Sequence, residues 1–92
     1  MARGVVALPL LFAISLAGAI GPAAADDREA CVDPHTTTDE RLPACNRAIA
    51  SGQWHGADLA RLYGARGERL MRQRELAHAI EDGAAAVAAE AT

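Results

Sequence analysis

The sequence predicts an all-α fold, a short array of helical hairpins with three helices that follows a signal peptide. Apolar residues recur at helical spacing in three stretches beyond residue 41, and no stretch alternates with the period of two that strands require. Only 3% of the residues are aromatic although 51% are hydrophobic, so alanine supplies much of the apolar content. A chain of 92 residues holds one domain at most, which excludes a two-domain enzyme, a transporter and a dinucleotide-binding domain.

The first 25 residues have the organisation of a signal peptide. Arg3 precedes an apolar run over residues 5–20, and the small residues Ala23, Ala24 and Ala25 end the segment. The Ala-x-Ala rule predicts cleavage after Ala25, which gives a periplasmic or secreted chain without membrane attachment. The alternative is an uncleaved anchor helix, because the apolar run has 16 residues and a membrane span needs about 17 to 25.

The charge balance excludes two classes of partner. Lysine and arginine together number 9, against 12 aspartates and glutamates, and the net charge is −3. Such a balance gives no basic surface for nucleic acid or for an anionic membrane.

The two cysteines, Cys31 and Cys45, predict one disulfide, because an even number behind a signal peptide reaches an oxidising compartment. A bridge over this spacing stabilises the folded state by about 3 kcal/mol in the chain-entropy model. A metal pair or a redox-active site remains the alternative. Neither is favoured, since the chain has no C-x-x-C motif and His35 has no partner at ligand spacing.

Residues 26–41 are expected to form an irregular lead-in, with Pro34 and a run of threonines. Thr38 or Asp39 is the expected N-cap of the first helix. Because Pro43 disfavours a helix interior, this helix is either short, over residues 42–51, or kinked. Gly52 is expected to end it as a C-terminal cap.

The second helix is predicted over residues 57–73 and the third from near residue 75 to near residue 90. The second carries apolar residues on one side and small residues on another, which suits close approach of a second backbone. The third is expected to present one apolar stripe, formed by Leu76, Ala79, Ile80, Gly83 and Val87. The turn between them is very short, so the two helices must pack antiparallel.

Across these two helices the spacing resembles a tetratricopeptide repeat, with its pattern W-x2-L-G-x2-Y, then A-x3-F, then P. The matching positions are Tyr63, Arg66, Gly67, Leu70, Ala79, Gly83 and Ala91. The resemblance covers residues 42–92 as about one and a half repeats, the half repeat lying over residues 44–52. It implies that Gly67 and Ala79 let the paired helices touch, and that Tyr63, Leu70 and Ala79, with Ile80, pack between helices.

The chain departs from this pattern at four positions. Arg66 replaces an apolar residue, Arg74 a turn glycine, Gly83 an aromatic residue and Ala91 the closing proline. Repeats bury their cores on neighbouring repeats, and about three are usually needed for stability. One and a half repeats are therefore expected to need the disulfide, self-association or a partner.

No motif for catalysis, cofactor binding or a metal site is found. His35, His55 and His78 lie far apart in the sequence, without H-E-x-x-H or a serine in a nucleophile turn. We therefore expect a protein that is not an enzyme, with no cofactor and no metal.

A partner site is suggested by one face of the second helix. In the repeat family this face of the first helix of a repeat lines the groove that binds peptides; here it carries Arg61, Gly64, Glu68 and Arg72. On this hypothesis the two arginines bind a carboxylate of the partner. The alternative is a solvated face with a Glu68–Arg72 pair. Trp54 likewise has two interpretations: it packs as a hydrophobic plug between the first and second helices, or it is exposed and anchors a partner.

The sequence thus predicts an exported, non-catalytic protein–protein interaction module of tetratricopeptide type, which binds a peptide or protein partner or forms a homo-oligomer. Two alternatives remain: a small secreted helical effector or inhibitor, and a truncated fragment of a longer repeat protein.

Overall fold

The computed structural model describes residues 21–92, which form four helices and no strand. The all-helical prediction is confirmed, but the predicted count of three is wrong because a further helix precedes the others. Most of the predicted signal peptide lies outside the described residues, and its expected cleavage point after Ala25 falls within the first described helix. The helices are α2 (Pro22–Val32), α3 (Thr38–Ala50), α4 (Gly56–Arg72) and α5 (Leu76–Glu90).

Helix α2 corrects the expectation of an irregular lead-in over residues 26–41. Pro22 stands in its first turn, where the fixed φ of proline suits a helix and its missing N–H costs nothing. Ala24 and Cys31 are buried on one side of α2. These tertiary contacts hold a segment that has no apolar periodicity of its own. Only residues 33–37 remain as a connection.

Helix α3 begins four residues before the short alternative and contains Pro43 in its interior. Its N-cap is Thr37, which precedes both expected positions, Thr38 and Asp39. The helix ends as expected, since Ser51 is the C-cap and Gly52 follows with a φ of 68°. The Ser51 hydroxyl donates to the Ala48 carbonyl and accepts from the N–H of Gln53, which closes the turn.

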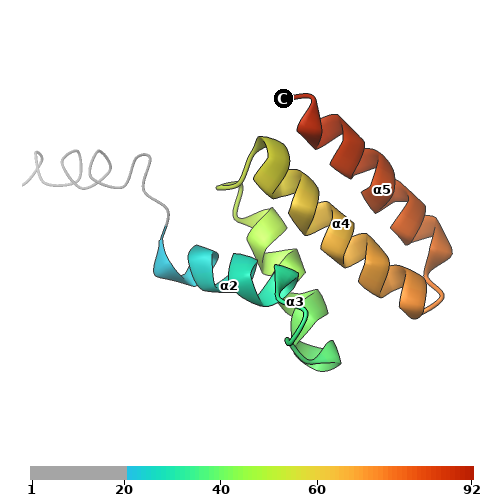
Figure 1. Ribbon diagram of the computed structural model, residues 1–92, viewed down its shortest axis with the longest axis horizontal. Helices are drawn as coiled ribbons and strands as arrows, with labels where there is room; N and C mark the ends of the chain where they lie inside the picture. Colours follow the sequence, from blue (N-terminus) through green and yellow to red (C-terminus); the bar gives the residue numbers. More distant parts are fainter. Residues whose placement is uncertain (1–20) are drawn as a thin grey trace, which may run out of the picture.

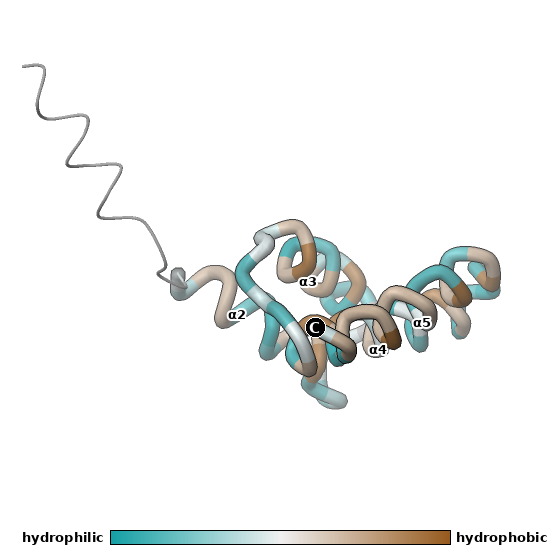
Figure 2. Tube along the Cα trace, turned by 90° about the horizontal axis from the view of Figure 1, so that it is seen from above, coloured by the Kyte–Doolittle hydropathy of each residue, from teal (hydrophilic) through white to brown (hydrophobic). Residues whose placement is uncertain are grey.

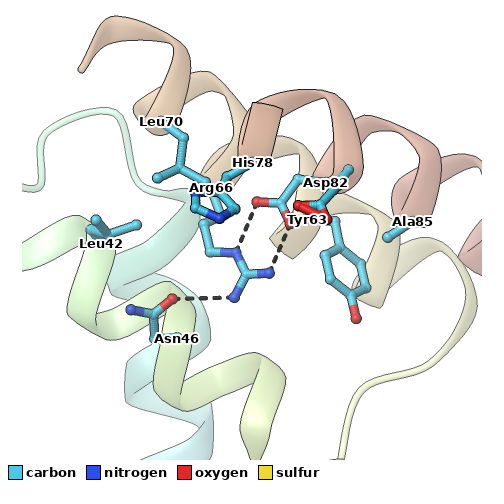
Figure 3. Close-up of a pocket in the computed structure, with 9 residues that line it drawn as sticks. Leu42, Asn46, Tyr63, Arg66, Leu70, His78, Asp82 and Ala85 are labelled. Atoms are coloured by element: carbon cyan, nitrogen blue, oxygen red, sulfur yellow. Dashed lines mark hydrogen bonds and ion pairs between the residues drawn. The ribbon is translucent and has the colours of Figure 1, made fainter. Parts of the chain in front are cut away.

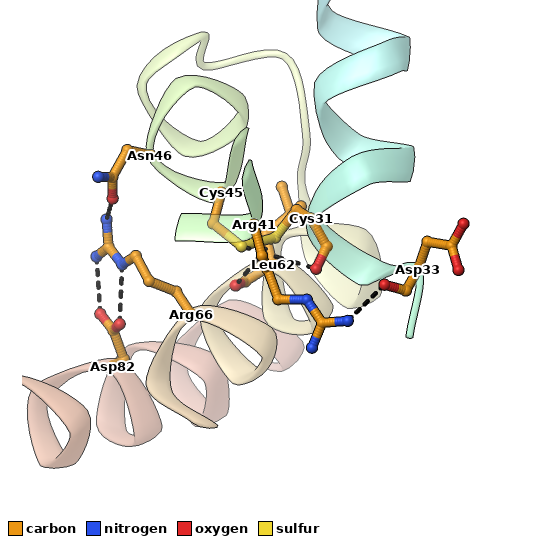
Figure 4. Close-up of a disulfide and its surroundings, with 8 residues drawn as sticks. All are labelled: Cys31, Asp33, Arg41, Cys45, Asn46, Leu62, Arg66 and Asp82. Carbon is orange, nitrogen blue, oxygen red and sulfur yellow. Dashed lines mark hydrogen bonds and ion pairs between the residues drawn. A yellow bond between two sulfur atoms is a disulfide. The ribbon is translucent and has the colours of Figure 1, made fainter. Parts of the chain in front are cut away.

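The core lies where α2, α3 and the first half of α4 meet. The predicted disulfide joins Cys31 of α2 to Cys45 of α3, and both residues are fully buried (Figure 4). Leu62 of α4 packs against the bridge with Ala44 and Ala48. Five buried residues make up this cluster, and only one of them is a large aliphatic side chain. The disulfide is therefore part of the core as well as a cross-link.

Trp54 closes the core from the loop between α3 and α4. Its ring packs against the buried cluster, and the Arg28 guanidinium of α2 lies 5.1 Å from the ring centroid. Arg28 also donates to Asp58 at 2.8 Å. The structure thus favours the plug over the exposed anchor, with α2 as an additional wall.

Helices α4 and α5 run antiparallel, and α5 forms an edge of the molecule (Figure 1). Their bounds agree with the predicted ones to within about one residue. The turn is a Schellman motif, in which Glu75 N–H donates to the Leu70 carbonyl and Arg74 N–H to the Met71 carbonyl. Arg74 has a φ of 66°, at the position where a glycine is usual. Among the described helices, α5 packs on α4 alone.

Candidate functional site

The orientation of α5 decides which surfaces this protein offers. Ala79, Asp82, Ala86 and Ala89 face α4 or are partly shielded by it, and Asp82 is only 4% exposed. Ala79 of the predicted apolar stripe thus faces α4, but its large side chains are exposed: Leu76 is 54% exposed, Ile80 73% and Val87 74%. The prediction that Ile80 packs between the helices of this chain is therefore wrong.

An ion pair explains this orientation. The Arg66 guanidinium of α4 donates to both carboxylate oxygens of Asp82 of α5, at 2.8 and 2.7 Å, and also to Asn46 of α3 at 3.2 Å. Figure 3 shows Arg66 between Asn46 on one side and Asp82 on the other. The hydrogen bond to Asp82 raises the pKa of Arg66, against the opposing effect of desolvation. A buried carboxylate without this partner would cost several kcal/mol, so α5 must keep Asp82 turned inward.

Gly67 allows helices α4 and α5 to approach each other closely. A Cβ at residue 67 would lie 3.2 Å from the Asp82 Cβ and 3.4 Å from the Ala79 carbonyl oxygen. The two small residues that the repeat resemblance singled out, Gly67 and Ala79, thus lie where α4 and α5 touch. Tyr63 and Leu70, on the same side of α4, are partly buried. The Tyr63 ring centroid lies 5.5 Å from the Arg66 guanidinium carbon.

An open groove of about 470 Å³ lies between α3 and α5, with α4 as its floor (Figure 3). We call it the front groove. It is lined by Leu42, Asn46, Tyr63, Arg66, Leu70, His78, Glu81, Asp82 and Ala85. Its central charges neutralise each other in the Arg66–Asp82 pair, which leaves no unpaired cation there for a ligand carboxylate. His78 at its edge lies 3.4 Å from Glu75.

The predicted partner face of α4 is exposed, as the structure places Arg61, Gly64, Glu68 and Arg72 together on one side of the helix. Arg72 donates to Glu68 at 2.9 Å, which is the i,i+4 pair of the alternative interpretation. Arg61 lines an open depression of about 320 Å³ with Val87 and Glu90 of α5. Gly64 and Glu68 border another, of about 310 Å³, with Met71 and Gly83. The structure therefore leaves Arg61 as the one arginine of this face outside an ion pair of the described residues.

The large side chains of the α5 stripe form an apolar surface whose exposure was not predicted from the sequence. It consists of the outward side chains of Leu76, Ile80 and Val87, with Met71 at the end of α4 exposed to 56%. We call it the α5 outer face. In Figure 2 the tube of α5 is coloured mostly on the hydrophobic side of the scale. The sequence feature that could have indicated this exposure is Asp82, an acid 16 positions after Arg66. Arg66 itself stands where the tetratricopeptide pattern has an apolar residue.

Other kinds of site find little support among residues 21–92. No group of three His, Cys, Asp or Glu side chains in this part could hold a metal ion. None of the helices described is both long and apolar enough to cross a membrane.

The carboxylate of Asp33 accepts a hydrogen bond from the N–H of His35 at 2.8 Å, which lowers the pKa of Asp33. This hydrogen bond closes the turn after α2.

Comparisons with protein-family models, with curated proteins and with solved structures find no match to this chain.

Proposed function

We propose that this protein is an exported, non-catalytic protein–protein interaction module, built as a tetratricopeptide-like hairpin with a disulfide-pinned half repeat. The observation that carries this proposal is the α5 outer face. Contiguous apolar surface of this kind on a folded protein marks an interaction site, because each large side chain left in water forgoes about 1.5 to 3 kcal/mol of burial.

The composition of the core strengthens the argument. The fully buried cluster contains a single large aliphatic residue, Leu62, whereas the α5 outer face exposes Leu76, Ile80 and Val87. A domain with so few large side chains gains most by burying these against a partner. Rotation of α5 cannot bury them within the chain, since it would separate Asp82 from Arg66.

Export rests on independent features. The Cys31–Cys45 disulfide and the absence of a membrane-spanning helix among the described residues are compatible with an oxidising, extracytoplasmic compartment. The proposed signal peptide, cleaved after Ala25, would deliver the chain there. The antiparallel α4–α5 hairpin, with Gly67 at its contact, supports the repeat-like assignment.

Photo-crosslinking in the exporting cell tests this function. A photoreactive amino acid replaces Ile80 on the α5 outer face, and the matched control replaces Glu40, an exposed residue of α3. We expect defined protein adducts from position 80 and none from position 40. The proposal fails if neither position gives an adduct, or if both give the same adducts.

A further inference from the structure

We propose that the α5 outer face binds a second copy of this chain, with the two α5 helices antiparallel about a two-fold axis between Gly83 and Ala84. This inference rests on the proposed function and names the occupant of its site. Four observations carry it: the spacing of the residues, their symmetry, the charges at the two ends of α5 and the position of α5 in the fold.

The spacing is that of a two-helix seam. Leu76, Ile80, Gly83 and Val87 follow one another at intervals of four, three and four residues. This heptad alternation keeps one stripe facing a second helix that crosses at a shallow angle. Helix α4 leaves the large side chains of the stripe exposed, because α5 packs on it through the side that holds Ala79 and Asp82. Gly83 and Val87 border open depressions that α5 shares with α4.

The stripe is also complementary to itself. An axis between Gly83 and Ala84 places Ile80 opposite Val87 of the second copy, and Val87 opposite its Ile80. The two small residues then lie at the crossing point, where a Cβ added to Gly83 meets nothing within 4 Å in the single chain. An isologous interface needs this self-complementarity, which an arbitrary partner helix would not require.

The ends of α5 carry opposite charges that form no ion pair within residues 21–92. Arg74 precedes the helix and Glu90 ends it, and neither joins an ion pair among the described residues. In the antiparallel arrangement Arg74 lies three residues, or about 4.5 Å along the axis, from Glu90 of the second copy. Arg74 has a left-handed backbone conformation, which is strained for any residue but glycine. A glycine would relieve this strain but would not carry the charge that can pair with Glu90 of the second copy.

The fold leaves room for the second copy. Helix α5 lies at an edge, away from α2 and α3, so its outer side is open along its length (Figure 1). One helix pair buries less than the roughly 800 Å² per partner of a standard interface. We therefore expect a weak dimer, with a dissociation constant of about 10 to 100 μM.

Sedimentation equilibrium of the purified protein, expressed from the full 92-residue chain with its disulfide intact, tests the dimer. We expect monomer–dimer exchange between about 1 μM and about 1 mM. Ile80→Glu should weaken association by about a hundredfold or more, because it places two charges in an apolar interface. Ala57→Glu, which adds the same charge at an exposed position of α4, should leave association unchanged. Circular dichroism verifies that both variants keep the wild-type helix content.

Charge reversal tests the orientation. Arg74→Glu and Glu90→Arg should each weaken the dimer several-fold, and the double variant should restore it, because the two charges meet across an antiparallel pair. Association that both single variants and the double variant leave unchanged would overturn the antiparallel arrangement.

Other outcomes separate the inference from the proposed function. A protein that stays monomeric at all concentrations, or a dimer that Ile80→Glu does not weaken, overturns the inference. If position 80 crosslinks to a different protein while the purified chain is monomeric, the interaction function stands and the second copy is excluded.

Discussion

At the scale of single residues, one ion pair sets the character of the surface. Asp82 is the only buried acid in the part of the chain that the structure describes, and its two short bonds to Arg66 fix how α5 lies on α4. Arg66 keeps about a quarter of its side chain exposed, so its guanidinium retains some contact with water. The pair stabilises one orientation of the helix and leaves the large apolar side chains of α5 exposed.

Removal of one partner tests this role. Asp82→Ala leaves the Arg66 charge without its carboxylate and with about a quarter of its side chain exposed. We expect a loss of about 2 to 3 kcal/mol in the free energy of unfolding, somewhat below the cost for a fully buried pair. Arg66→Met with Asp82→Ala should cost less than the single change, since no charge remains unpaired. Urea unfolding followed by circular dichroism measures both, and a single variant within about 0.5 kcal/mol of wild type would contradict the role.

Gly67 and Gly64 form a matched pair in the same helix. Gly64→Ala should stabilise the protein by about 0.5 to 1 kcal/mol, because its Cβ meets nothing within 4 Å and alanine favours the helix. Gly67→Ala should instead destabilise it by about 1 kcal/mol, since its Cβ would press on Asp82, which Arg66 holds in place. Thermal melts of the two variants side by side provide the measurement. Equal stabilisation by both would mean that α5 can shift away from α4.

Arg74 offers a test in which stability and association diverge. Arg74→Gly removes a non-glycine residue with a left-handed backbone from the Schellman turn. Glycine also makes the unfolded chain more flexible, which offsets part of this effect. We expect the free energy of unfolding to rise by about 0.5 to 1 kcal/mol. The same change removes the charge proposed to meet Glu90 of a second copy, so self-association should weaken several-fold. Chemical denaturation and sedimentation on one preparation report the two effects. A variant that melts below wild type would show that the arginine side chain stabilises the turn.

At the scale of elements, the sequence was most informative where its periodicity was strong. The bounds of α4 and α5, their antiparallel packing and the Cys31–Cys45 bridge were all predictable, because the motifs that determine them are local or few in number. Helix α2 was not, since its helicity depends on the burial of Ala24 and Cys31 against segments distant in the sequence. The outward orientation of α5 was missed for a related reason. Periodicity identifies an apolar stripe but does not say which neighbour it faces, and the Arg66–Asp82 pair that decides it spans two helices.

The disulfide links α2 and α3, whose other buried residues are all alanines. Its loss, by reduction or by Cys31→Ser with Cys45→Ser, should lower the free energy of unfolding by about 3 kcal/mol, because the unfolded chain regains the entropy of an open loop. Leu62 would also lose packing against the bridge. Thermal melts with and without reductant measure this loss. The double serine variant is the control, and a reductant effect on it as large as that on wild type would exclude the bridge as the cause.

At the scale of the whole molecule, the disulfide-centred core and the α5 outer face lie on opposite sides of α4. The core holds α2, α3 and the first half of α4 through small residues, whereas α5 has α4 as its only helical neighbour in the described chain. Stability and association are then linked, because burial of Leu76, Ile80 and Val87 against a second copy covers a helix that packs on α4 alone among the described helices.

This linkage predicts a melting temperature that depends on protein concentration. Above the dissociation constant, each tenfold rise in concentration stabilises the dimer by about 0.7 kcal/mol per protomer, which corresponds to about 3 to 5 °C in a domain of this size. Ile80→Glu should abolish the dependence, while Ala57→Glu should retain it. Calorimetric scans over a hundredfold range of concentration, with the disulfide intact, provide the measurement. A wild-type melting temperature that stays constant over this range would mean that α5 is stable on α4 alone, and that its apolar side is not covered by a second copy.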